Sequence, residues 1–267
     1  MLHFLRYTFI PTALAILFLR TTLYAPSLVS EVSNIPLTAP NDPYAICTDI
    51  GYTSLKNQTG SYFTTLPFSP EELADDHIWK FVGPELGLSN TQYTPTDLVP
   101  IKNQYIEQRG RVSKLRKEAA EALWKMAEAF HNEFNTGLIV VSGYRSYDYQ
   151  QRLVDLGCSS NLCAPPGHSE HQLWLAIDIL EASTKEEYDR NPTYTKYYNW
   201  MKKNAHLYWF HQSYQRWASG DGYDIEPWHW RYLWTDLATE LIRLNWSFTE
   251  YSTLQNLVNK DTVSIIQ

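Results

Sequence analysis

The chain has 267 residues, of which 44% are hydrophobic and 15% aromatic, enough for a packed core in one large domain or two small ones and too many for a disordered chain. The formal net charge is −7, and Lys and Arg occur only in short clusters such as "SKLRKE". Because nucleic-acid binding needs a concentrated positive surface, we expect no nucleic-acid partner.

The start of the chain combines positive charge with a short apolar segment. Residues 7–19 are mostly apolar and lie between Arg6 and Arg20. This segment is shorter than the roughly 20 residues that span a bilayer and is typical of a signal peptide. We therefore expect residues 1–25 to be a signal peptide, or a membrane anchor held through residues 7–19, because no clean cleavage site precedes Pro26. A buried N-terminal helix is the alternative.

A long helix is the clearest predicted element. Residues 26–80, rich in Ser, Thr, Pro, Asn and Gly, precede it and predict a linker and irregular lead-in. Within "GRVSKLRKEAAEALWKMAEAFHNEFN" the apolar residues step by three or four positions, and Asn135 and Gly137 mark the end of the helix. These apolar residues are Val112, Leu115, Ala119, Leu123, Met126 and Phe130.

Shorter elements follow this helix. The β-branched residues 139–141 predict a buried strand that leads into a Ser/Gly turn, and "LWLAIDIL", residues 173–180, predicts a second strand. Residues 197–210, "YYNWMKKNAHLYWF", predict a helix, and "SGDGYDIEPWHWRYLW" predicts a turn and a further strand. The order helix, strand, strand, helix, strand indicates an α+β domain.

Three cysteines fit an exported protein without requiring it. Cys158 and Cys163 bracket the loop-like "SSNL" and could form a small disulfide; two free thiols are the alternative. A cysteine zinc site is not expected, because no CxxC pair occurs and Cys47 stands alone.

Histidines and carboxylates gather in two stretches, "PPGHSEHQLWLAIDI" (residues 165–179) and "EPWHWRY" (residues 226–232). Two imidazoles and one carboxylate, from His171, Asp178 and His229, are the ligand types of a catalytic zinc, which keeps one position open for water. Such an ion lowers the pKa of its bound water to about 7. Glu226 could then act as the carboxylate that accepts the water proton.

The sequence segments around these residues resemble the motifs of a known family. "SEHQLWLAIDI" resembles the SxHxxGxAxD motif, and "EPWHWRY" the ExxH motif, of the VanY-type carboxypeptidases within the LAS metallopeptidases, which also include L,D-carboxypeptidases of the LdcB/DacB type. "VSGYRSYDYQ" resembles the family's SGYRS segment, and the resemblance extends over about residues 93–251. It implies one zinc-peptidase domain of the hedgehog-like type, with an antiparallel sheet flanked by helices.

The resemblance implies roles at matching positions. His171, Asp178 and His229 would be the zinc ligands and Glu226 the general base. Arg145 would face the scissile carbonyl or the substrate carboxylate. Gln150 and Ser169 would line the substrate groove.

Each role has a plainer alternative. His171 and His229 could be ordinary hydrogen-bonded histidines, and Arg145 could brace a loop. Asp178 could cap a turn, although an unpaired charge within "LAIDIL" would be costly. We expect His168 to bond within its turn, and we assign no role to His206 or His211.

Tryptophan stands where the family motifs have glycine. The exchange occurs at Trp174, Trp209 and Trp234, and less clearly at Trp246. Because UGA encodes Trp in some genetic codes and Gly in others, we hypothesise that the first three are glycine in the native protein. If Trp174 is genuine, it would crowd the strand beside the zinc.

The sequence thus predicts an exported enzyme of the periplasm or cell envelope. It would be a monomeric zinc carboxypeptidase that trims peptidoglycan stem peptides, with D,D- or L,D-specificity open. An endopeptidase of the same fold and a silent wall-binding module are the alternatives. We expect residues 1–25 as signal or anchor, 26–80 as linker, 81–255 as the zinc-peptidase domain and 256–267 as a tail.

Overall fold

The computed structural model describes residues 53–56, 62–65, 73–109, 113–180, 185–234 and 237–255. The predicted signal or anchor segment, Cys47 and the tail lie outside these described residues. Within the described part, no helix combines the length and apolar character needed to cross a bilayer.

Two parts of the predicted linker over residues 26–80 form ordered structure instead. The antiparallel strands β1 (Thr53–Lys56) and β2 (Tyr62–Thr65) lie within it. Residues just before 81 also pack in the domain, since the indole Nε1 of Trp79 donates to the Leu233 carbonyl at 2.6 Å. The folded domain therefore begins before residue 81.

A five-stranded sheet carries the domain, and the α+β prediction is confirmed. Its order is β4-β6-β7-β9-β8. Three of its four pairings are antiparallel as predicted, but the edge strand β4 runs parallel to β6, which makes the sheet mixed. Its strands are β4 (Ile106–Gln108), β6 (Leu138–Ser142), β7 (Ala176–Ile179), β8 (Phe210–Gln212) and β9 (His229–Tyr232).

The long helix is α2 (Lys117–Phe134), which begins later than predicted. Leu115 instead belongs to the short strand β5 (Lys114–Arg116), which pairs with β3 (Leu98–Pro100). The Leu115 side chain is buried although it lies in a strand. Its apolar character therefore continued the spacing of three or four residues that predicted the helix. The helix ends as predicted, because Asn135 takes the left-handed conformation and donates its N–H to the His131 carbonyl.

The second predicted helix also begins at a different residue. Helix α5 (Pro192–Asn204) starts where the Asn191 side chain accepts hydrogen bonds from the next turn and proline occupies the first position. The 3₁₀ helix η2 (Ala205–Tyr208) follows it. The described residues also form helices that were not predicted from the sequence: α3 (Tyr147–Asp155), α4 (Lys185–Arg190), α6 (Ala218–Asp221), α7 (Leu237–Leu244) and a helical segment over residues 248–255.

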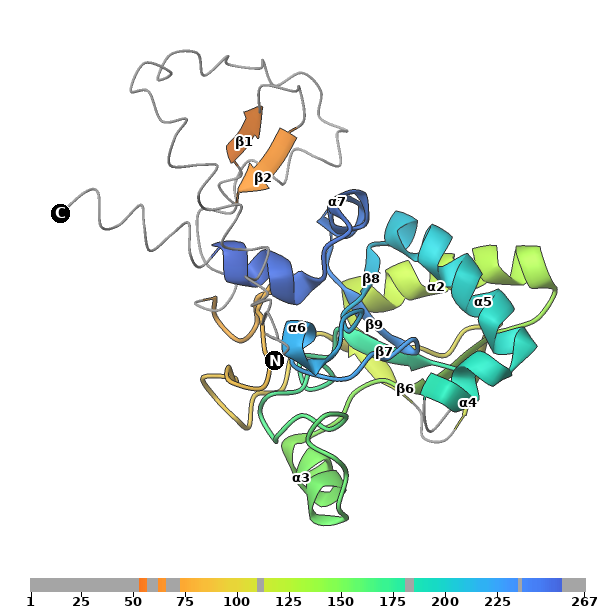
Figure 1. The fold of residues 1–267 in the computed structure, drawn as a ribbon. Helices are drawn as coiled ribbons and strands as arrows, with labels where there is room; N and C mark the ends of the chain where they lie inside the picture. Colours follow the sequence, from red (N-terminus) through yellow and green to blue (C-terminus); the bar gives the residue numbers. More distant parts are fainter. Residues whose placement is uncertain are drawn as a thin grey trace, which may run out of the picture. The chain divides into compact units, whose positions relative to one another are not determined.

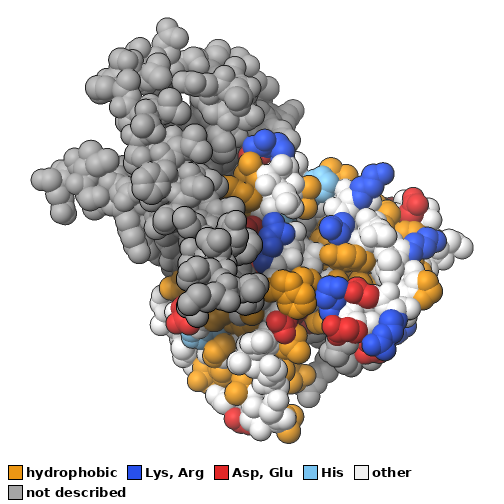
Figure 2. All heavy atoms as spheres, viewed as in Figure 1, with side chains coloured by type: hydrophobic (Ala, Val, Ile, Leu, Met, Phe, Trp, Pro, Cys, Tyr) orange, Lys and Arg blue, Asp and Glu red, His pale blue; other side chains and the backbone are white. Residues whose placement is uncertain are grey.

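The core lies between the sheet and the helices α2 and α5 (Figure 1). Helix α2 buries its apolar face, with Leu123, Met126 and Phe130 fully enclosed. The rings of Tyr197 and Trp200 from α5 meet Phe130 edge to face. Helix α3 lies apart from this layer at the lower edge of the view. On the face shown in Figure 2, positive and negative side chains are interspersed.

Three tryptophans have a backbone conformation that favours glycine. A left-handed backbone costs an L-residue about 1–2 kcal/mol, and only Asn and Asp tolerate it readily. Trp246 does not share this conformation, whereas Trp174, Trp209 and Trp234 do, as the glycine hypothesis expects. The non-glycine residues with positive φ in the described part are Asn135, Trp174 (60°), Leu180, Trp209 (64°), Trp234 (47°) and Asn245.

Candidate active site

The register of the sheet brings two of the predicted metal ligands together. Asp178 on β7 lies directly opposite His229 on β9 in an antiparallel pair. Directly opposed residues point to the same face of a sheet. Two residues that are far apart in sequence therefore present a carboxylate and an imidazole to one point.

His171 reaches the same point from the turn that precedes β7. Its Nδ1 donates to the Gly143 carbonyl at 2.6 Å, which orients the ring. Gly143 follows β6 directly, and a Cβ there would meet the Ser113 Cβ at 2.9 Å. The close approach of the two chain segments thus requires glycine at this position and places the carbonyl that holds His171.

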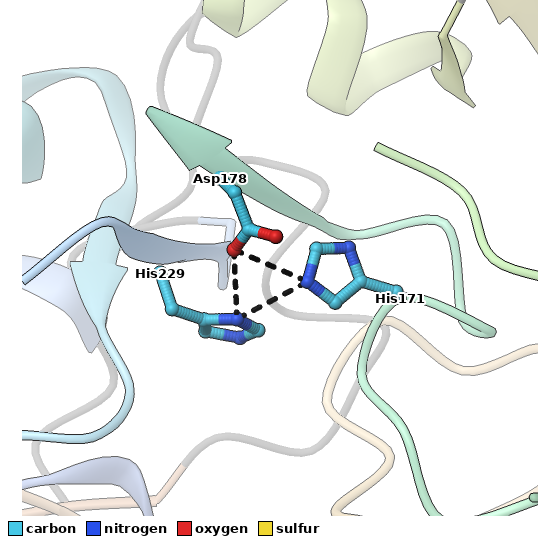
Figure 3. Close-up of side chains that lie close together, drawn as sticks. All are labelled: His171, Asp178 and His229. Atoms are coloured by element: carbon cyan, nitrogen blue, oxygen red, sulfur yellow. Dashed lines mark hydrogen bonds and ion pairs between the residues drawn. The ribbon is translucent and has the colours of Figure 1, made fainter. Parts of the chain in front are cut away.

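Three ligand atoms converge between these side chains (Figure 3). His171 Nε2 lies 3.3 Å from Asp178 Oδ1 and 3.2 Å from His229 Nδ1. His229 Nδ1 lies 3.4 Å from Asp178 Oδ1. All three atoms fall within 4.8 Å of one another.

The hydrogen bonds of the two imidazoles define which atoms are free for a cation. The outward nitrogens, His171 Nδ1 and His229 Nε2, face a carbonyl and a carboxylate, so in the neutral rings both carry the proton. The inward nitrogens then hold lone pairs that face the Asp178 carboxylate. Three acceptors without a proton between them repel one another unless a cation binds, and two imidazoles with one carboxylate suit zinc.

The electrostatics of the site agree with a cation there. Burial lowers the pKa of His171 to about 4, which keeps the ring neutral as a ligand must be. Burial would also lower the pKa of His229, yet its bonds to Asp178 and Glu170 raise it to about 9. The surroundings of His229 therefore favour positive charge at this point.

Glu170 also belongs to this site, although it was not predicted from the sequence. Its Oε2 accepts from His229 Nε2 at 2.9 Å, and its Oε1 pairs with Arg231 Nη1 at 2.9 Å. Burial would raise the pKa of Glu170, but Arg231, His229 and the Ser213 hydroxyl hold it at about 2. A carboxylate on the outer nitrogen of a ligand histidine fixes its orientation. The sequence contains a signal for Arg231 but not for Glu170. Arg231 lies two residues after His229, and residues two apart in a strand point to the same face of the sheet.

Glu226 lies beside the three converging atoms. Its Oε2 is 3.6 Å from His229 Nδ1, and its backbone N–H donates to the Tyr214 carbonyl. Burial raises the pKa of Glu226 to about 7. A carboxylate with such a pKa can both accept and return a proton near neutral pH.

The other predicted residues line one pocket. Arg145 Nη2 lies 3.7 Å from Asp178 Oδ2, and Gln150 and Ser169 line the pocket with Glu226. Tyr214 and Tyr223 also line the pocket, with Leu162 and Ala164, and none of these four was predicted. The pocket is lined by Arg145, Gln150, Leu162, Ala164, Ser169, His171, Tyr214, Tyr223, Glu226 and His229.

His168 and His211 lie outside the group of ligand atoms. His168 Nδ1 faces the Gly83 carbonyl at 2.8 Å, so its partner lies outside its own turn, and it is not among the grouped ligand atoms. His211 is buried, with its Nε2 2.8 Å from the Gln215 amide nitrogen.

Comparisons with known proteins identify the family. A family model described as "VanY: D-alanyl-D-alanine carboxypeptidase" matches residues 112–235. The solved structure of the LdcB LD-carboxypeptidase is 32% identical with a TM-score of 0.56, and the match covers 66% of this chain and 86% of LdcB. The chain belongs to the VanY carboxypeptidase family.

Other known proteins give similar matches. YodJ of Bacillus subtilis (strain 168) is 37% identical over 55% of this chain and 59% of YodJ. VanY from the VanB-type vancomycin resistance cassette, solved with Zn(II), is 24% identical with a TM-score of 0.50, covering 64% of this chain and 96% of that one. Its complex with D-alanine-D-alanine matches at 26% identity and a TM-score of 0.50, covering 64% and 94%. The chain spans about half the length of the curated relatives it matches, 46 to 59%.

Proposed function

We propose that this VanY-family chain is a zinc-dependent carboxypeptidase that removes the C-terminal D-alanine of peptidoglycan stem peptides. The observation that carries the proposal is the convergence of His171 Nε2, Asp178 Oδ1 and His229 Nδ1 beside a buried carboxylate. The family, and relatives solved with zinc, with D-alanine-D-alanine or for peptidoglycan recognition, support it.

The three ligand residues would hold the ion, and the neighbouring groups would perform the proton transfers. Zinc, when bound, lowers the pKa of water and polarises a carbonyl. Glu226 accepts the proton of the attacking water and returns it to the leaving amine, for which its raised pKa is suited. Glu170 and Arg231 hold His229 in its ligand orientation.

Arg145 supplies the positive charge that a peptide substrate needs. Its guanidinium lines the pocket and lies 3.7 Å from the Asp178 carboxylate. Such a group binds a terminal carboxylate or the oxygen that becomes negative during hydrolysis. A carboxypeptidase binds the terminal carboxylate of its substrate in this way. The substrate of an endopeptidase has no terminal carboxylate next to the bond that is cleaved.

We further propose that the protein acts in the cell envelope, with residues 1–25 as signal peptide or membrane anchor. The disulfide between Cys158 and Cys163 supports export, since disulfides persist in oxidising compartments.

A digest of purified muropeptides with mass readout tests the function. Loss of D-alanine from a pentapeptide ending in D-alanyl-D-alanine supports D,D-carboxypeptidase activity, and loss from a tetrapeptide supports L,D-activity. Cleavage within a cross-link favours the endopeptidase. Binding of wall peptides without any cleavage by the zinc-loaded protein contradicts the enzyme and favours the silent module.

Replacement of the proposed base gives a sharper prediction. Glu226→Gln should retain zinc but lower turnover by roughly 10²-fold or more, because proton transfer is lost while the ion stays. The measurement is D-alanine release under saturating peptide, with metal analysis of the same sample. Glu107→Gln, on an exposed carboxylate paired with Arg109, is the matched control and should leave turnover unchanged. Full turnover in Glu226→Gln rejects the base role.

A further inference from the structure

We propose that the Cys158–Cys163 disulfide positions Gln150 in the substrate pocket, so that the disulfide sets how tightly the stem peptide binds. The inference rests on the proposed function and concerns a different part of the pocket from the metal ligands. The two cysteines close a short loop after α3, with a sequence separation of 5.

Gln150 has one amide atom engaged and one without a partner. It is the buried residue of α3, only 1% exposed, and it lines the pocket. Its Nε2 donates to the Ala164 carbonyl at 2.8 Å. A carbonyl can only accept, so this bond decides which way the amide is turned. Its Oε1 is buried and has no hydrogen-bond partner in the described part of the chain.

The disulfide holds the carbonyl that orients Gln150. Ala164 follows Cys163 directly, and the Cys163 N–H donates to the Ser159 carbonyl at 2.8 Å. On the other side of the loop, the Asn161 carbonyl accepts from the Asp224 N–H at 2.8 Å, two residues before Glu226. The disulfide-closed loop therefore bridges the α3 wall of the pocket and the segment that carries Glu226.

A buried acceptor without a partner is costly unless a ligand supplies the donor. In a pocket for peptides, the donor that fits Gln150 Oε1 is an amide or ammonium N–H of the stem peptide. If the Ala164 carbonyl moves, the Gln150 amide loses the bond that keeps Oε1 available. Opening the disulfide should therefore weaken peptide binding through Gln150.

A double-mutant cycle tests this route. Binding of a peptide ending in D-alanyl-D-alanine and of a tetrapeptide is measured by calorimetry on the zinc-loaded full chain, in the Glu226→Gln background so that turnover does not interfere. Four proteins are compared: the Glu226→Gln parent, Cys158→Ser with Cys163→Ser, Gln150→Leu, and the combination. We expect the serine pair to raise the Kd about fivefold to tenfold, as for one lost hydrogen bond. In the Gln150→Leu background the same pair should change the Kd by less than about twofold.

An equal change of Kd in both Gln150 backgrounds, or no change of Kd when the disulfide is removed, overturns the inference. Absence of peptide binding in the parent overturns it as well. Should the serine pair fail to fold, reduction of the folded parent and of its Gln150→Leu variant with a phosphine gives the same comparison. One water is consumed, its oxygen goes to the phosphine oxide, and its two hydrogens go to the two thiols. The wild-type digest separates the two proposals, since D-alanine release with an unchanged Kd on disulfide removal contradicts only this inference.

Discussion

Alanine at either ligand histidine should abolish zinc binding and D-alanine release. His171 and His229 each supply one of the three converging ligand atoms. The loss of a direct ligand should lower zinc affinity by more than the roughly 10–100-fold that follows loss of a ligand's outer hydrogen-bond partner. Metal analysis after dialysis should find about one zinc per wild-type chain and none in His171→Ala or His229→Ala.

A matched histidine in the same turn provides the control for this experiment. His168 lies three residues before His171, but its Nδ1 faces the Gly83 carbonyl. His168→Ala should therefore keep its zinc. D-alanine release at the full rate by wild-type protein stripped of metal contradicts the zinc assignment, and loss of zinc in all three variants indicates misfolding instead.

Glycine at positions 174, 209 and 234 should give a more stable and more active protein than the chain as written. Each of the three tryptophans has a left-handed backbone. Relief of this conformation contributes about 1–2 kcal/mol per residue, or about 3–6 kcal/mol in the triple variant. That gain is comparable to the whole stability of many domains, about 5–15 kcal/mol.

The surroundings of Trp174 and Trp209 explain why glycine would fit better at these two positions. The Trp174 ring is buried against Tyr144, with a ring-centroid distance of 3.5 Å. Among the residues that the structure describes, its Nε1 has no hydrogen-bond partner. Trp209 ends η2 by donating its N–H to the Ala205 and His206 carbonyls, the helix-end position at which glycine is preferred. Because Trp174 lies three residues after His171, the effect on activity should be largest at this position.

Urea unfolding and D-alanine release measure the effect. Trp246→Gly is the matched control, since Trp246 does not have a positive φ. It should destabilise the protein, because glycine loses more backbone freedom on folding than any other residue. In the source DNA, the codons at 174, 209 and 234 should be UGA, and those for Trp228 and Trp230 should be UGG. UGG at position 174, or a less stable Trp174→Gly protein, contradicts the hypothesis.

Local sequence was sufficient for the candidate ligands and for the ends of some elements. His171, Asp178, His229 and Glu226 were named from motif spacing, and the structure brings all four together. Asn135 ends α2 as its residue type predicts. The start of α2 was misplaced because Leu115, which is buried in a strand, continued the apolar spacing of the helix. Periodicity does not distinguish a short strand from the first turn of a helix when both bury apolar side chains in the same core.

By itself, the sequence predicted the α+β class from the order of its elements. Its motifs are recognised from residue type and short spacing, and their family resemblance implied the ligand residues and the positions at which glycine is expected. Tertiary structure alone decided the partners of those residues. The contact of Glu170 with His229 spans 59 positions, and the bond from Gln150 to Ala164 depends on how a disulfide-closed loop folds back on α3. Such pairings follow from strand register and loop closure, which bring distant residues together through packing of the whole domain and leave no periodic signal in the chain.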